Sequence, residues 1–156
     1  MTWRTTFWLL VPVLLLNGAL ASSLPEPYQS PAFDAIPVWL AVAEGILRVG
    51  VFGAPLVLPL ALEGPRHRAG WFCYGVGLLA YGASWAAVIR WPESGWSRSL
   101  LGFTAPAWTP GLWLLGMALL SGRVPFTKVG AAAPYGVVCG VFLLVHVGHA
   151  VWVHPG

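Results

Sequence analysis

Hydrophobic residues fill five long stretches of the chain, and polar residues gather in the connections between them. The stretches cover about residues 7–22, 37–62, 70–89, 101–120 and 131–153. A helix needs roughly 17–25 residues to cross the hydrocarbon core of a bilayer, and these runs do not alternate with polar residues as barrel strands do. The pattern predicts an all-α membrane protein, an up-down bundle of five transmembrane helices in one domain over residues 1–156.

The first stretch is the shortest and has a second interpretation. Arg4, the apolar run that follows it and the small residues Ala19-Leu20-Ala21 also fit a cleaved signal peptide. Cleavage there would leave four spanning helices. Both interpretations place the residues after Ser22 outside the cytoplasm.

The composition agrees with lipid as the solvent. Of the 156 residues, 58% are hydrophobic and 8% are charged, whereas a soluble domain is about a quarter charged. The chain cannot cover itself with polar surface, so its first partner is the lipid bilayer. The net charge is +3, but no basic cluster is long enough to follow a phosphate backbone, which argues against nucleic acid as a partner.

The basic residues of the connections predict the orientation in the cell membrane. One set of alternate connections contains five Lys or Arg residues and the other set contains two. The richer set is expected in the cytoplasm, so the N-terminus would be cytoplasmic and the C-terminus outside. The first set is Arg4, Arg66, Arg68, Arg123 and Lys128, and the second is Arg90 and Arg98.

Two connections on the predicted outer side are more than tight turns. Leu24–Ile36 contains three prolines and is expected to be extended, because proline cannot sit inside a helix without breaking its hydrogen bonds. Arg90–Leu100 mixes Trp, Ser and charged residues. We expect it to lie in the membrane interface and to include one helical turn.

Small residues predict where helices approach closely. Gly136 and Gly140 form a GxxxG motif in the last stretch, and such spacing lets two backbones meet in lipid. The contact would be made within the bundle. The alternative is contact with a membrane-protein partner or a second copy of the chain.

Paired prolines mark two of the predicted helices. Pro55 and Pro59 lie near the end of the second stretch, and Pro106 and Pro110 lie in the fourth. Each removes an intrahelical hydrogen bond, so we expect a structural kink at both places. The alternative is a broken helix that lines a cavity.

The strongest functional indication is a set of polar residues at one depth. Glu44 and Arg48 share one helix face, and so do His146 and His149. Ionisable groups in hydrocarbon are costly unless paired and turn toward the bundle interior, so these four are predicted to line a ligand-binding pocket in the outer half of the bundle. The alternative is that they only neutralise and satisfy one another. Five further residues at a similar depth complete the predicted pocket: Asn17, Tyr81, Ser84, Trp108 and Thr109.

The same residues suggest a second chemistry. His146, His149 and Glu44 would supply three ligands for a metal, which would make the chain a membrane-embedded metal-binding protein or enzyme. The sequence contains no HExxH motif and no nucleophile motif, so no catalytic residue is assigned and the cofactor stays unknown. Cys73 and Cys139 form no CxxC motif, which argues against a thiol redox pair.

One short stretch resembles a known family. Ala107-Trp108-Thr109-Pro110 is similar to part of the TspO/translocator proteins, but that family's Trp- and Pro-rich pattern after the first helix is not present here. No residue or ligand is carried over. The preferred hypothesis is a non-enzymatic membrane protein that binds a small or lipid-like ligand or the helix of a partner. A third hypothesis is a structural subunit of a membrane complex that docks through its last helix.

Overall fold

The computed structural model describes residues 4–25, 28 and 36–155, and regular structure within these residues is entirely helical. Four helices are long and apolar enough to cross a membrane: Thr6–Ser23, Val38–Leu56, Arg66–Arg90 and Ala132–Trp152. The all-helical class is therefore confirmed, together with four apolar helices of spanning length.

The named elements of the first half are η1 (Thr6–Leu9), α1 (Val11–Leu20), η2 (Ala21–Ser23), α3 (Val38–Gly53) and η4 (Ala54–Leu56). Those of the second half are α4 (Pro65–Arg90), α5 (Gly95–Arg98), α6 (Leu100–Phe103), α7 (Ala105–Trp108), α8 (Pro110–Leu120) and α9 (Ala132–Trp152).

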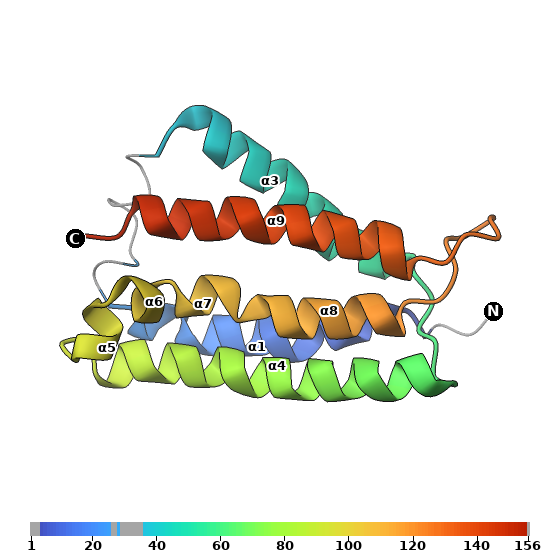
Figure 1. Ribbon diagram of the computed structural model, residues 1–156, viewed down its shortest axis with the longest axis horizontal. Coiled ribbons are helices and arrows are strands. Elements are labelled where there is room, and N and C mark those ends of the chain that lie inside the picture. The colour runs from blue at the N-terminus through green and yellow to red at the C-terminus, as the bar shows by residue number, and fades with distance from the viewer. Residues whose placement is uncertain (1–3, 26–27, 29–35, 156) are drawn as a thin grey trace.

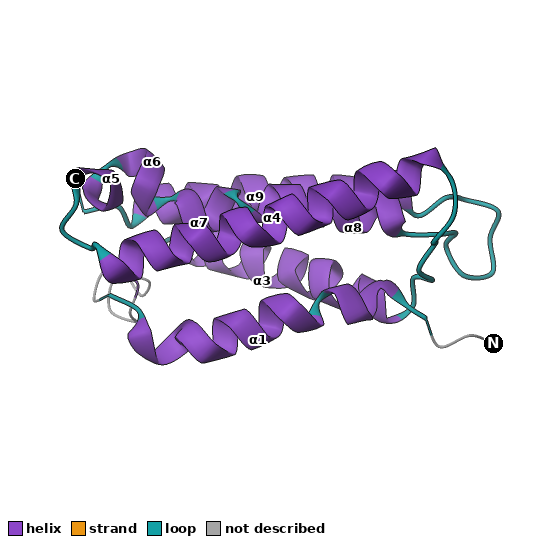
Figure 2. Ribbon diagram, turned by 90° about the horizontal axis from the view of Figure 1, so that it is seen from below, coloured by secondary structure: helices purple, strands orange, loops and turns teal. Residues whose placement is uncertain are grey.

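The helices lie side by side as two outer pairs with a central column between them. Figure 1 shows α3 and α9 together on one side, α1 and α4 on the other, and the column of α6, α7 and α8 between them. Figure 2 shows the same bundle from below, with α1 along one edge. The closest packing is between α4 and α8, followed by α3 with α9 and α8 with α9.

The prolines of the fourth predicted span interrupt its helical hydrogen bonding, but the chain keeps helical dihedral angles at both junctions. The span is divided into α6, α7 and α8, with breaks at Thr104 and Thr109 just before Pro106 and Pro110. Its longest apolar helix, Ala105–Leu120, is shorter than the four spanning helices, so a fifth crossing stays a prediction. The hydroxyl of Thr104 donates to the carbonyl of Leu100, and the hydroxyl of Thr109 donates to the carbonyl of Ala105, each at 2.7 Å.

The second predicted span ends earlier than expected. The helix stops at Leu56 instead of continuing to residue 62, because Pro55 and Pro59 cannot supply the N–H groups that further turns require. The chain after the helix pairs with other backbones: Thr6 donates its N–H to the Leu58 carbonyl at 2.9 Å, and Gly122 donates to Pro59 at 2.8 Å. The expected kink is thus a helix end.

The outer connections agree in part with expectation. Arg90–Leu100 contains the single turn α5, capped by the hydroxyl of Ser94, which confirms the predicted helical turn. In Leu24–Ile36 the N–H of Tyr28 donates to the Pro25 carbonyl at 2.9 Å. Most of that connection lies outside the described residues.

Glycines that the sequence analysis passed over control the closest helix contact. A Cβ at Gly77 would lie 2.2 Å from the backbone nitrogen of Trp113, and one at Gly116 would lie 2.5 Å from that of Tyr74. Backbones of α4 and α8 therefore touch directly, which only glycine permits. In the predicted GxxxG motif, Gly136 faces Ala118 at an ordinary 3.7 Å, and nothing lies within 4 Å of a Cβ built at Gly140.

Candidate functional site

The carboxylate of Glu44 is the centre of the most polar group in the bundle. Its Oε1 atom accepts a hydrogen bond from Nη2 of Arg48 and lies 3.0 Å from Nδ1 of His146. Its Oε2 atom is hydrogen-bonded to Nδ1 of His149. The structure therefore brings together the four residues that the sequence analysis placed at one depth, although a contact does not by itself show that they bind a ligand.

Helix geometry explains this convergence. Residues three or four positions apart lie on the same side of a helix, so α3 presents Glu44 with Arg48, and α9 presents His146 with His149. Because α3 packs along α9, the two faces meet. A carboxylate inside an apolar bundle is tolerable only when its oxygens are paired, and here both oxygens are.

The four side chains differ in how much they remain accessible. The Glu44 side chain is 4% exposed, whereas Arg48 is 56% exposed. His146 is intermediate at 30% exposed, and its ring stacks on Phe142 with 5.2 Å between centroids. All four side chains line one cavity, and Arg48 and His146 are the more accessible of them.

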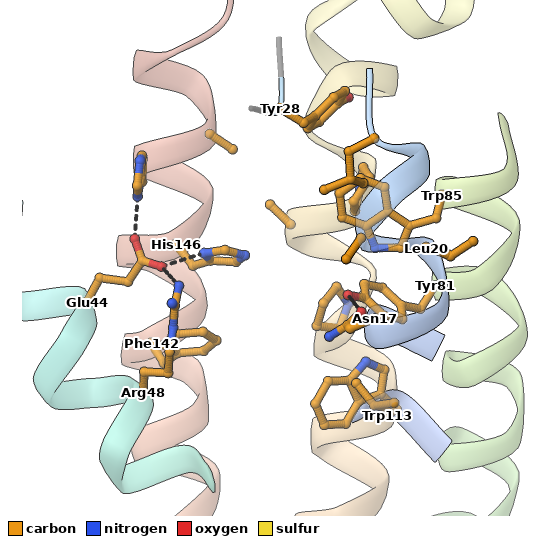
Figure 3. Close-up of a pocket in the computed structure, with 18 of the residues that line it drawn as sticks. Asn17, Leu20, Tyr28, Glu44, Arg48, Tyr81, Trp85, Trp113, Phe142 and His146 are labelled. Atoms are coloured by element: carbon orange, nitrogen blue, oxygen red, sulfur yellow. Dashed lines mark hydrogen bonds and ion pairs between the residues drawn. The ribbon is translucent and has the colours of Figure 1, made fainter. Parts of the chain in front are cut away.

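These groups form one wall of a cavity of about 630 Å³. Figure 3 shows α3 and α9 carrying Glu44, Arg48, Phe142 and His146 on one side, with an open gap between them and the helices opposite. The ring nitrogen of His146 that does not contact Glu44 points into this gap. The cavity is lined mostly by apolar and aromatic side chains, so its polar groups are few and concentrated.

The opposite wall is aromatic and belongs to α1, α4 and α8. The hydroxyl of Tyr81 donates to Oδ1 of Asn17 at 2.6 Å. The rings of Trp85 and Trp113 each meet Tyr81 edge-on, with 6.4 Å between centroids. Figure 3 shows all four side chains facing the gap. The Tyr81–Asn17 hydrogen bond joins α4 to α1 within this wall.

Trp113 has an unused donor. Its side chain is 3% exposed, and its Nε1–H group has no hydrogen-bond acceptor in the described part of the chain. In Figure 3 the nitrogen lies on the side of the ring that faces Asn17 and the cavity. The nitrogen is fully buried, so this donor is not open to the cavity in the structure.

Tyr28 closes the end of the cavity nearest to α6. Its ring stacks on Phe103 at 4.7 Å and meets Trp85 edge-on at 5.4 Å. Its hydroxyl donates at 2.9 Å to the carbonyl of Phe103, which the break before α7 leaves without its helical partner. Burial raises the pKa of Tyr28 to about 12, so this hydroxyl stays a neutral donor at physiological pH.

Three residues of the predicted pocket do not line this cavity, and their part in ligand binding stays a prediction. Ser84 and Thr109 face each other across the seam between α4 and α8, with 3.3 Å between their hydroxyl oxygens, and both also donate to backbone carbonyls. Trp108 is 40% exposed and its Nε1–H donates to the carbonyl of Leu101. These three share the depth of the cavity but not its side of the helix.

The sequence analysis missed the aromatic lining. Trp113, Trp85, Phe142 and Phe103 line the cavity, yet aromatic residues are common in membrane helices and carry no separate signal. Tyr28 was missed because its connection has no helical period. The prolines were a usable signal: Pro106 and Pro110 also line the cavity, as the alternative of a broken helix had indicated.

A metal does not fit the four polar residues as they stand. Among the described residues, no three His, Cys, Asp or Glu side chains are arranged as ligands of one ion. The guanidinium of Arg48 occupies the same carboxylate oxygen that His146 contacts, and a metal cation there would be repelled by it.

Comparison with protein-family models, curated proteins and solved structures finds no match for this chain. The resemblance around Ala107-Trp108-Thr109-Pro110 thus has no family match behind it.

Proposed function

We propose that this chain is a multi-pass membrane protein without enzymatic activity that holds a small or lipid-like molecule in the cavity between α3–α9 and α1–α4–α8. The observation that carries the proposal is the cavity itself, of about 630 Å³. Ligand sites typically measure about 300–1,000 Å³ and combine an apolar lining with a few placed polar groups. The paired charge of Glu44 and Arg48 beside aromatic rings supplies that combination.

The proposal includes an orientation. With the basic connections in the cytoplasm, the C-terminus and the cavity lie toward the outer face. The side chains at that end include Tyr28, which closes the cavity, and Asn17, which lines it. A molecule would then enter from the outer leaflet or from outside the cell.

Mass spectrometry of molecules that copurify with the full chain in mild detergent tests the proposal. Ala150 lines the cavity on α9, and Ala150→Phe would fill part of it. Ala41 on α3 is exposed and does not line the cavity, so Ala41→Phe is a matched control. We expect the wild type and Ala41→Phe to retain the same small molecule and Ala150→Phe to lose most of it. Equal retention by all three proteins would place the molecule on the lipid-facing surface and would contradict the proposal.

A further inference from the structure

His146 presents a hydrogen-bond acceptor to the cavity. Its Nδ1 atom lies 3.0 Å from the Glu44 carboxylate, and a carboxylate only accepts hydrogen bonds, so the hydrogen of the neutral ring is on Nδ1 and Nε2 keeps a lone pair. Among the described residues Nε2 has no hydrogen-bond partner, and it is not one of the fully buried polar atoms. Figure 3 shows this nitrogen directed into the gap. A ligand that reaches it must bring a hydrogen to donate.

Arg48 places donors beside this acceptor. Its Nη2 atom donates to the same Glu44 oxygen that His146 contacts, so the guanidinium and the imidazole are neighbours. A guanidinium carries five N–H groups, and the side chain is 56% exposed, so donors remain beyond the one used on Glu44. The group that complements a neighbouring acceptor and donor is a hydroxyl, because its hydrogen donates while its oxygen accepts.

The charge of the site also favours a neutral group. Among the described residues that line the cavity, the charged ones are Glu44 and Arg48, and these cancel when the imidazoles are neutral. An anion in this apolar surrounding would have no net positive charge to compensate its lost hydration. A carboxylate or a carbonyl would also set its oxygen lone pairs against the lone pair on Nε2 of His146. A hydroxyl avoids both costs without a change in protonation.

The rest of the lining determines what carries the hydroxyl. Most of the other side chains are apolar or aromatic, among them Leu20, Phe52 and Phe142. A lining of this kind gains free energy by covering hydrocarbon. Because the acceptor and the donors are neighbours on one wall, the complementary molecule has one small polar head and a larger apolar body.

We propose that the ligand is a lipid alcohol, whose hydroxyl donates to Nε2 of His146 and accepts a hydrogen bond from Arg48 while its apolar body fills the rest of the cavity. This inference rests on the proposed function and narrows it to one class of molecule. Long-chain alcohols, diacylglycerols and sterols share this chemistry.

Two isomeric probes test the hydroxyl in the wild type. Undecanol and methyl decyl ether contain the same atoms, but only undecanol has a hydrogen to donate. Each would be titrated into the full chain by calorimetry at one probe-to-detergent ratio, with undecanoate as the anionic probe of equal chain length. We expect undecanol to bind about five- to tenfold more tightly than the ether, the effect of one hydrogen bond. Equal binding of the two isomers, or tighter binding of undecanoate, would overturn the inference.

A variant of His146 locates the hydrogen bond. His146→Phe keeps an aromatic ring but removes Nε2, and we expect the preference for undecanol over the ether to disappear. His67→Phe is the matched control, because His67 lies in the first turn of α4 and does not line the cavity, and it should keep the preference. A general disturbance of the fold would weaken both isomers alike. A preference that survives in His146→Phe would therefore refute the contact.

If His146→Phe does not fold, Ala150→Phe serves in its place, with Ala41→Phe as its control. The added ring fills part of the cavity, and we expect undecanol to lose its preference in Ala150→Phe alone. The same titration with dioctanoylglycerol and with cholesterol distinguishes the sources of the hydroxyl, because the tightest binder of the three identifies the apolar body that fits.

The cavity-filling variant separates the two levels of the proposal. If undecanol, dioctanoylglycerol and cholesterol do not bind but another molecule copurifies and is lost in Ala150→Phe, the lipid-alcohol assignment fails and the proposed function stands. If no molecule depends on Ala150, both fail.

Discussion

Glu44 and His149 lie 105 positions apart in the chain, yet Nδ1 of the imidazole is hydrogen-bonded to the carboxylate in the interior of the bundle. This contact joins α3 to α9 and, with His146 and Arg48, leaves neither carboxylate oxygen unpaired. The residues that pair with the Glu44 carboxylate are therefore also residues that line the cavity. A change at Glu44 is expected to affect both the pairing and the cavity.

The first prediction concerns stability. Glu44→Gln replaces a charged acceptor of three hydrogen bonds by a neutral amide and leaves Arg48 without its counter-charge. A hydrogen bond to a charged group contributes about 1.5–3 kcal/mol. The amide of Gln can keep some of these bonds, and Arg48 is partly exposed, so we expect the free energy of unfolding to fall by about 2 kcal/mol in detergent. Thermal unfolding followed by circular dichroism would show a lower midpoint.

Glu93→Gln is the control for this measurement. Glu93 pairs with Arg98 on the surface, where both side chains are more than half exposed, and exposed ion pairs contribute little. Equal midpoints for Glu44→Gln and Glu93→Gln would show that the Glu44 carboxylate is solvated in the folded protein.

The second prediction concerns the seam between α4 and α8. A Cβ at Gly116 would lie 2.5 Å from the backbone nitrogen of Tyr74 and 2.7 Å from its Cα atom, and neither atom can move without shifting the helix. We expect Gly116→Ala to destabilise the fold by about 3 kcal/mol or more, at the upper end of overpacking effects. Yield of folded protein and thermal midpoint are the measurements.

Gly140→Ala is the matched control, since nothing lies within 4 Å of its added carbon. We expect it to be neutral in a monomer. A shift of the association state in this variant, measured by analytical ultracentrifugation in detergent, would instead support the hypothesis of a homo-oligomer through Gly136 and Gly140.

The third prediction concerns the first helix, which we expect to remain in the mature protein. The Tyr74 hydroxyl donates to the Leu9 carbonyl at 2.7 Å, and Tyr81 donates to Asn17. Val13 is buried in the core at 1% exposure. Cleavage would leave two hydroxyls unpaired and open the cavity. Intact-mass analysis of the protein from membranes decides the matter, and a mature chain that begins after Ala21 would refute the prediction.

The fourth prediction concerns metal content. Because Arg48 already holds the carboxylate oxygen that His146 contacts, we expect the wild type and the double variant His146→Ala/His149→Ala to contain equal, substoichiometric amounts of transition metal by elemental analysis. One equivalent of metal in the wild type that disappears in the double variant would establish the metal-binding alternative.

Sequence reasoning reached the four residues around Glu44 because two local rules suffice for them. Spacing within a helix places Glu44 beside Arg48 and His146 beside His149, and the cost of charge in lipid turns such faces inward. The same reasoning misplaced Ser84 and Thr109, which lie at the right depth but on the seam between α4 and α8. The depth of a residue in the membrane follows from counting residues along its helix. Which neighbouring helix or cavity its side chain faces depends on how the helix is rotated about its axis, and counting does not give that rotation.

The sequence by itself determined that the chain is helical and apolar and that Glu44, Arg48, His146 and His149, which lie within its apolar stretches, share one level. Those properties are local, because hydrogen bonding within each helix and the scarcity of polar residues do not depend on neighbours. Only the tertiary structure decided which side chains face the cavity. Contact of α4 with α8 at Gly77 and Gly116 sets the rotation of both helices, and that rotation buries Trp113.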